Sequence, residues 1–213
     1  MVMQEALTLS ATQEMLAAVA RHIVANVDML TAVDQAIGDG DHGIGMRRGF
    51  AAVLEEMQKP AAGGVDAPFK LAGMAIMSKT GGAAGAVFGT LFRSGGTALA
   101  GRGSFDAEAL ATFLQSGLEA VEKRGGSRPG QKTMLDALAP AAEAAVRAAP
   151  DGLPAAVRAA AQAAAEGVEA TKSMVATTGK ARTLGERSLG HPDPGAVSLK
   201  LILEAMRDYI VSA

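Results

Sequence analysis

The sequence has no cysteine and no tryptophan, and aromatic residues make up only 3% of its 213 residues. Without cysteine, the chain can form neither a disulfide framework nor a thiolate metal site, and it has no cysteine nucleophile. The 20 basic residues nearly balance the 22 acidic ones, and a net charge of −2 provides no basic surface for nucleic acid. No apolar stretch approaches about 20 residues, and residues 1–9 lack the layout of a signal peptide. We therefore expect a cytoplasmic protein that binds no nucleic acid and no membrane.

Alanine dominates the sequence and alternating β-branched segments are rare, so the secondary structure should be almost wholly helical. With 49% apolar residues, residues 1–213 can form one domain around a single hydrophobic core. Helical periodicity and the positions of glycine and proline predict eight helices in an all-α, single-domain bundle. Their approximate ranges are 10–28, 41–59, 69–78, from the glycines at 81–85 to 100, 106–124, 132–148, 154–174, and from 193 onward.

Glycine-rich connections precede the second, fourth, sixth and eighth predicted helices. In an up-and-down bundle, alternate connections emerge at the same end. The topology therefore predicts that one end of the bundle is functional and that four connections there can enclose one ligand. These connections are residues 34–45, 78–85, 125–133 and 177–195.

Three aspartates, Asp34, Asp39 and Asp41, fall close together in the first of these connections, with no lysine or arginine among them. Carboxylates this crowded repel one another unless a cation lies between them, and Mg²⁺ is held by a few carboxylates while phosphate oxygens and waters complete its shell. Glycines at 38, 40 and 43 remove side chains around the carboxylates, which suits a bulky ligand. The segment predicts a metal site that also binds phosphate. The alternative is a solvated loop in which Asp41 caps the following helix.

Two further connections have the composition of phosphate-binding loops. Residues 77–85 place small residues before a helix N-terminus, where unpaired N–H groups favour an anion, although close packing of helices explains them equally well. Gly125 and Gly130 have P-loop spacing, but Gln131 intervenes before Lys132 and the preceding element is a helix. A Walker A site is therefore rejected, and a loop that faces a nucleotide remains open.

The last connection, residues 178–195, mixes three cations with several glycines. Lys180, Arg182 or Arg187 could neutralise phosphate oxygens. Alternatively, Glu186 could pair with one of the two arginines on the surface. The histidines next to these connections fit a ligand or base as well as a helix cap or a packing role.

Taken together, several motifs in these connections resemble those of the nucleotide-binding L subunit (DhaL) of bacterial dihydroxyacetone kinases. The motifs are Gly-Asp-Gly-Asp-His-Gly at 38–43, Gly-Gly-Ala at 81–83, Lys-Thr-Met at 132–134, and Leu-Gly-Glu-Arg-Ser at 184–188, followed by His191 and by Asp-Pro-Gly at 193–195. The resemblance implies an antiparallel eight-helix barrel that holds ADP or ATP and two Mg²⁺ ions at one end.

The resemblance also implies roles for individual residues. By the resemblance, Asp34, Asp39 and Asp41 are expected to be the metal ligands. Phosphoryl transfer also needs a cation to absorb developing charge, for which Lys180 or Arg182 is available, so these five residues form the expected catalytic set. The residues expected to line the nucleotide are His42, Gly43, Ile44, Gly45, Ala83, Ala84, Gly125, Met134, Lys180, Asp193, Pro194 and Gly195, together with the helix N-terminus at Gly81 and Gly82. The sequence departs from the family pattern at Gly45, Ala84 and Gln131, where the family has asparagine, serine or threonine, and an acid.

In such a kinase, a separate K subunit holds dihydroxyacetone on a histidine, and the L subunit delivers the γ-phosphoryl group to it. In the phosphotransferase-system version of such a kinase, the nucleotide stays bound and a phosphohistidine M subunit recharges it. Two other functions remain open. The chain could be a kinase subunit that exchanges ATP and acts on another small ketose, or a non-catalytic regulatory subunit that senses nucleotide. Whether it forms a homo-oligomer is left open by the sequence.

Overall fold

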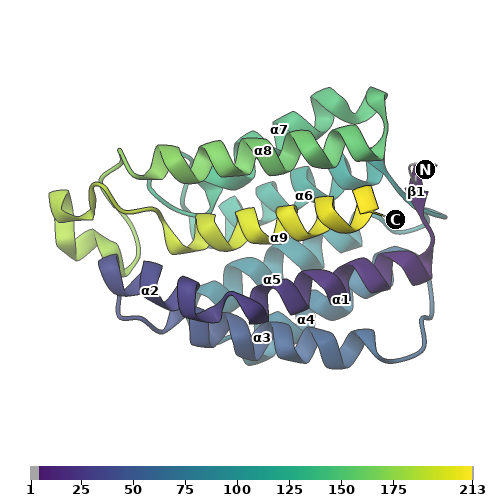
Figure 1. The fold of residues 1–213 in the computed structure, drawn as a ribbon, viewed down its shortest axis with the longest axis horizontal. Coiled ribbons are helices and arrows are strands. Elements are labelled where there is room, and N and C mark those ends of the chain that lie inside the picture. The colour runs from purple at the N-terminus through teal and green to yellow at the C-terminus, as the bar shows by residue number, and fades with distance from the viewer. Residues whose placement is uncertain (1–4, 213) are drawn as a thin grey trace.

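The computed structural model describes residues 5–212, and most of these residues lie in long helices that run back and forth along one axis (Figure 1). The α-helices are α1 (Leu9–Ala25), α2 (Val27–Ile37), α3 (His42–Met57), α4 (Asp66–Lys79), α5 (Gly82–Thr97), α6 (Ala107–Gly125), α7 (Leu135–Ala148), α8 (Leu153–Thr171) and α9 (Pro194–Ser212). Two 3-10 segments, η1 (Ala149–Asp151) and η2 (Lys180–Ser188), and a ribbon of β1 (Ala6–Leu7) and β2 (Phe105–Asp106) complete the fold.

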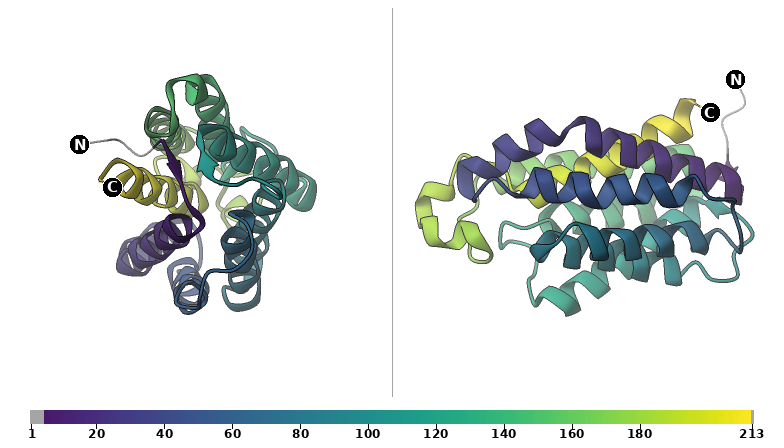
Figure 2. Two further views of the ribbon diagram at one scale, coloured as in Figure 1. Left: turned by 90° about the vertical axis from the view of Figure 1, so that its right-hand side faces the viewer. Right: turned by 90° about the horizontal axis from the view of Figure 1, so that it is seen from below.

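The long helices surround a common axis, as the end-on view in Figure 2 shows. Helix α1 packs against α3, each helix from α3 to α8 packs against the next one, and α9 closes the ring by packing against both α8 and α1. Small residues allow these close approaches. At Gly167 of α8, a Cβ atom would lie only 2.3 Å from the backbone oxygen of Asp136 in α7. The expected all-α fold is confirmed.

The expected count of eight helices is wrong for residues 5–212, which contain nine α-helices. The predicted helix 10–28 ends at Ala25, and after a bend of 57° the chain continues as α2. Helix α2 buries Val27, Leu30, Asp34 and Ile37, a spacing that places all four on one helical face. Asp34 therefore lies in the last turn of a helix rather than in a loop.

Two smaller features also differ from the sequence-based expectation. The antiparallel pairing of Ala6 with Asp106 joins segments about a hundred residues apart, and no local pattern signals it. The sixth predicted helix begins at Leu135 instead of 132, because Lys132 adopts a left-handed conformation with φ 59° that a helix cannot contain.

Phenylalanine side chains fill the interior of the ring. All six are fully buried, and five of them form a continuous series of ring contacts with centroid distances between 4.6 and 6.1 Å. In order of contact they are Phe105, Phe69, Phe113, Phe92 and Phe50. These rings form a continuous aromatic core that fills the interior of the ring of helices.

The two ends of the bundle carry different elements. β1 and the last turn of α9 lie at one end, and η2 lies with the α2–α3 connection at the other (Figure 1).

Within residues 5–212, no single helix is long and apolar enough to cross a membrane; α1 and α2 meet the length and composition criteria only as a bent pair. The signal-peptide expectation for residues 1–9 and the domain range 1–213 extend to residues 1–4 and 213, which lie outside the described residues.

Candidate active site

A cavity of about 520 Å³ opens at the end of the bundle that carries η2, and its lining comes from all four glycine-rich connections. The predicted convergence of these connections at one end is therefore confirmed. The lining includes these residues that the sequence indicated: Asp34, Asp41, His42, Gly45, Gly81, Gly82, Ala83, Ala84, Gly125, Met134, Lys180, Asp193, Pro194 and Gly195.

Four expected site residues are not part of this lining. Gly43 packs against α2, where a Cβ atom would lie 2.2 Å from Thr31 Oγ1. Ile44 is exposed on α3, and Arg182 is exposed on η2. Asp39 lies at the rim, where it joins the aspartate cluster.

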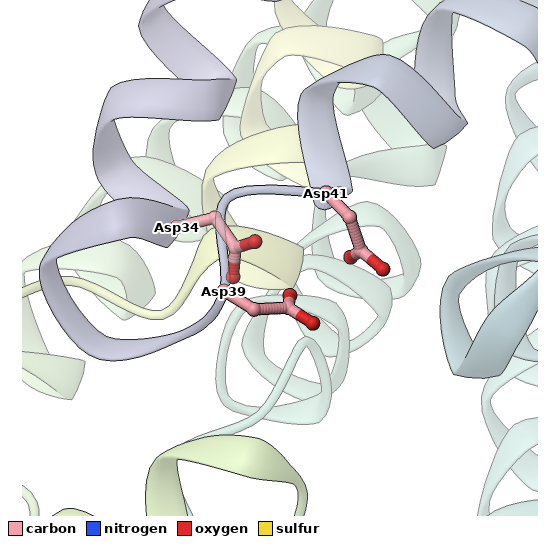
Figure 3. A group of neighbouring side chains, drawn as sticks. All are labelled: Asp34, Asp39 and Asp41. Carbon is pink, nitrogen blue, oxygen red and sulfur yellow. The ribbon is translucent and has the colours of Figure 1, made fainter.

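The side chains of the three aspartates lie close together around the turn between α2 and α3 (Figure 3), and Asp34 and Asp41 line the cavity. One carboxylate oxygen from each of Asp34, Asp39 and Asp41 lies within 4.8 Å of the others. Asp34 is buried, and its Oδ2 accepts a hydrogen bond of 3.1 Å from the backbone N–H of His42. Asp41 stands at the N-cap of α3, but its side chain makes no capping hydrogen bond there. The carboxylates thus face a common space, and the alternative in which Asp41 serves as a cap is not observed.

The turn between α2 and α3 depends on two glycines. A Cβ atom at Gly38 would lie 2.2 Å from Asp34 Oδ1, so any other residue would displace a carboxylate of the cluster. Gly40 has φ 78°, a left-handed conformation that glycine adopts at low cost. Together they bring Asp39 and Asp41 back over the end of α2.

Lys180 of η2 reaches this cluster from the far side of the mouth. Its Nζ donates hydrogen bonds to Asp39 Oδ2 and, at 3.0 Å, to Asp41 Oδ2. The hydrogen bond from Lys180 lowers the pKa of Asp39, and the hydrogen bonds to Asp39 and Asp41 raise the pKa of Lys180. All three side chains are more than half exposed, so these ion pairs add little to folding stability. Their effect is to bring a cation and carboxylates together at the mouth.

His42 connects the start of α3 to α9. Its Nε2 lies 2.7 Å from Ser198 Oγ, and its ring lies 6.5 Å from the ring of Phe88, centroid to centroid. Burial lowers the pKa of His42, which favours a neutral imidazole at neutral pH. These contacts indicate that His42 forms part of the cavity wall.

The N-terminus of α5 opens into the same cavity. The helix starts after Gly81, which has φ 78° and provides no side-chain cap, and its first hydrogen bond runs from Gly85 N to Gly81 O. The N–H groups of Gly82, Ala83 and Ala84 therefore have no partner within the helix. Backbone N–H groups at a helix N-terminus favour an anion.

Asp136 shapes the loop before α7 by accepting hydrogen bonds from the backbone N–H groups of Gly130 and Thr133, the latter at 2.7 Å. Lys132 lines the cavity, but its Nζ donates to the carbonyl oxygens of Thr171 and His191 at 2.5 and 2.6 Å. Burial lowers the pKa of Lys132. This lysine therefore ties α8 to the segment before α9 instead of presenting its charge to the cavity.

Asp193 caps the N-terminus of α9. Its Oδ2 accepts a hydrogen bond of 2.7 Å from Ala196 N, and its own N–H donates to Thr171 Oγ1 at 3.0 Å. Burial raises the pKa of Asp193 to about 7, because the carboxylate is poorly solvated and the bond from Ala196 only partly offsets this.

Six polar residues of the lining were not among the expected site residues: Arg48, Thr80, Ser127, Lys132, Thr133 and Thr178. A signal for Arg48 was present, since residues 41, 45 and 48 share one helical face. The other five lie in connections that the sequence predicted to enclose a ligand, and Lys132 and Thr133 also belong to one of the family motifs. The surface pairing of Glu186 with Arg182 or Arg187 is not observed among the described residues.

Comparisons with known proteins bear on this site. A family model described as the DAK2 domain matches residues 36–208. The chain is 42% identical over 187 residues to "PEP-dependent dihydroxyacetone kinase 1, ADP-binding subunit DhaL" of Listeria innocua, covering 88% of this chain and 89% of that protein. It is 34% identical to the L-erythrulose 1-kinase of Mycolicibacterium smegmatis, covering 85% of this chain and 32% of the relative.

A solved structure is similar as well. The crystal structure of the dihydroxyacetone kinase from C. freundii in complex with AMP-PNP and Mg²⁺ superimposes with a TM-score of 0.68 at 27% sequence identity. The alignment covers 92% of this chain and 33% of that one. This chain thus spans about a third of the length of the two larger kinases, and nearly the full length of the Listeria subunit.

Proposed function

This chain belongs to the DAK2-domain family, and from that premise we propose that it is the ADP- or ATP-binding subunit of a dihydroxyacetone kinase. The observation that carries the proposal is the meeting of Asp34 and Asp41 with the open N-terminus of α5 in one cavity, where Asp39 completes the aspartate cluster at the rim. Such a cavity offers negative charge for a metal and N–H donors for phosphate oxygens. The Listeria relative, similar over nearly its whole length, is named as an ADP-binding subunit.

The aspartate cluster has the donor set that Mg²⁺ prefers. Carboxylate oxygens of Asp34, Asp39 and Asp41 lie close enough to bind a common ion or a pair of ions, and no nitrogen or sulfur ligand is among them. We assign these three residues as the ligands of two Mg²⁺ ions. When bound, the metal neutralises charge on the phosphate oxygens of the nucleotide. Lys180, which contacts Asp39 and Asp41, then has phosphate oxygens within reach as alternative partners.

The residues of this chain position and neutralise rather than form covalent bonds, which is what phosphoryl transfer requires. N–H groups of α5 orient the phosphates, and Gly125, Met134 and residues 193–195 form the apolar and backbone walls for the nucleoside. Lys180, with Arg182 nearby on η2, absorbs charge as the γ-phosphoryl group leaves. No general base is assigned in this chain, because the acceptor hydroxyl arrives on a separate K subunit.

The partners follow from the same proposal. A K subunit presents dihydroxyacetone at the open mouth, and a phosphohistidine M subunit recharges the nucleotide, in keeping with the phosphoenolpyruvate dependence in the name of the Listeria relative. A second candidate function is an ATP-exchanging kinase subunit that acts on another small ketose, and the name of the L-erythrulose 1-kinase supports such a ketose as the acceptor. The two differ in how long the nucleotide stays bound.

Native mass spectrometry of the purified protein tests the proposal. Bound ADP that survives gel filtration supports the coenzyme mode, and an empty protein that binds MgATP reversibly supports the exchanging kinase. The second step is reconstitution with a K subunit and an M subunit, with phosphorylated dihydroxyacetone as the readout. A chain that binds neither ADP nor ATP in the presence of Mg²⁺ would refute both functions.

A further inference from the structure

Arg48, in the second turn of α3, is one of three cationic side chains that line the cavity. The other two are already engaged: Lys132 with two carbonyl oxygens, and Lys180 with two carboxylates. Arg48 makes one hydrogen bond, from Nη2 to the carbonyl oxygen of Thr80 at 3.0 Å, and it forms no ion pair within residues 5–212. Most of its five N–H donors are therefore available to a ligand.

Two glycines on α3 determine where this guanidinium lies. A Cβ atom at Gly45 would lie 3.1 Å from Thr80 O, and one at Gly49 would lie 1.9 Å from Thr80 Oγ1. Because both positions lack a side chain, the end of α4 packs directly on α3, and Arg48 between them extends over Thr80. Its Nη2 lies 3.7 Å from the point that a Cβ atom of Gly81 would occupy.

The guanidinium thus lies beside the open N-terminus of α5. Gly82 has no atom within 4 Å of its Cβ position, and Ala83 and Ala84 contribute no polar side chain. An anion bound at these N–H groups would lie next to the guanidinium of Arg48. Arginine binds phosphate through parallel N–H donors, which a single backbone N–H cannot provide.

We propose that Arg48 contacts the β-phosphate of the bound nucleotide and, with the N-terminus of α5, fixes the phosphate chain on the side opposite the metal ligands. Asp41 and Arg48 are seven residues apart on one helix, so their backbones are separated by roughly 10 Å along its axis. A phosphate chain that extends from the aspartate cluster to α5 would be held at both ends. The inference rests on the proposed function, because it assigns one residue of the same site.

The test compares the affinity for ADP, AMP and AMP-PNP, each with Mg²⁺, by isothermal titration calorimetry. Arg48→Gln is expected to weaken ADP and AMP-PNP binding by about 10- to 100-fold, the range for one lost charge-assisted contact, and to leave AMP nearly unchanged. Arg48→Lys keeps the charge but loses the fork, so it should fall between wild type and Arg48→Gln. Arg47→Gln is the matched control, since Arg47 is exposed on the same helix and lies outside the cavity lining.

Three results would overturn the inference. Equal weakening of AMP and ADP would mean that Arg48 acts only by supporting Thr80, and unchanged ADP affinity would mean that it contacts no phosphate. If Arg48→Gln does not fold, Arg48→Lys takes its place in the test. A wild-type-like ratio of ADP to AMP affinity in that variant would contradict the inference. A wild-type protein that binds no adenine nucleotide would overturn the proposed function as well, which separates the two failures.

Discussion

Replacing Gly49 by alanine should destabilise the protein, although alanine is the better helix former. A Cβ atom at this position would lie 1.9 Å from Thr80 Oγ1 and 3.3 Å from Thr80 Cβ, so α3 and α4 would have to separate. Overpacking of this severity costs about 3 kcal/mol, and the gain in helix propensity returns about 1 kcal/mol. The expected net loss is about 2 kcal/mol, which for a chain of this length lowers Tm by roughly 4–8 °C.

Thermal unfolding followed by circular dichroism, together with urea titration, measures this loss. Thr80→Ala is the partner variant, because Thr80 Oγ1 has no hydrogen-bond partner among the described residues and its removal sacrifices none. In the double variant the overlap disappears, and a coupling free energy of about 1–2 kcal/mol is expected. Gly103→Ala is the control, since nothing lies within 4 Å of its Cβ position. The reasoning fails if Gly49→Ala is as stable as wild type, or if the coupling is zero.

Three further predictions concern the charged groups of the site. Asp39→Asn should abolish Mg²⁺-dependent ADP binding without changing helicity. The control is Asp151→Asn, a change at an exposed residue of η1 far from the cluster. Wild-type-like ADP binding by Asp39→Asn would contradict the assignment of Asp39 as a metal ligand. Asp193 holds its proton up to a pKa of about 7 when folded but releases it near 3.8 when unfolded, so its contribution to stability is lost as pH rises through 7. The unfolding free energy in urea should fall less between pH 5 and 8 in Asp193→Asn than in wild type, and equal slopes would refute this. Lys132→Met should lower Tm, because the carbonyl groups of Thr171 and His191 lose their donor, and it should also raise the Kd for ADP; an unchanged Tm would show that the two bonds are unimportant.

Local patterns were sufficient to predict most of the fold. Periodic apolar residues and glycine or proline breaks located the long helices, and alternation of connections placed four loops at one end. Helix α2 was missed even though Val27, Leu30 and Ile37 follow helical spacing, because the aspartates and glycines nearby suggested a loop. The error matters, since the last turn of α2 is what positions Asp34.

Contacts between distant segments could not be derived in this way. Lys180 and Asp39 are 141 residues apart, and nothing in either segment signals that they meet. The same holds for Lys132, whose Nζ donates to the carbonyl oxygens of Thr171 and His191, 39 and 59 residues away in the sequence. The family resemblance leads one to expect asparagine at position 45, and the structure gives a reason for glycine. A Cβ atom at this position would lie 3.1 Å from Thr80 O, which is a tight contact.

The bundle places its first and last described elements far from the cavity. β1 and the last turn of α9 lie at the end remote from η2 and the aspartates (Figure 1), while the ring closes through α9 and α1. A fluorophore, a surface tether or a second polypeptide attached at that end would leave the mouth unobstructed. Immobilised in this way, the molecule would present its cavity outward to a protein that carries the phosphate acceptor, an orientation suited to measuring docking directly.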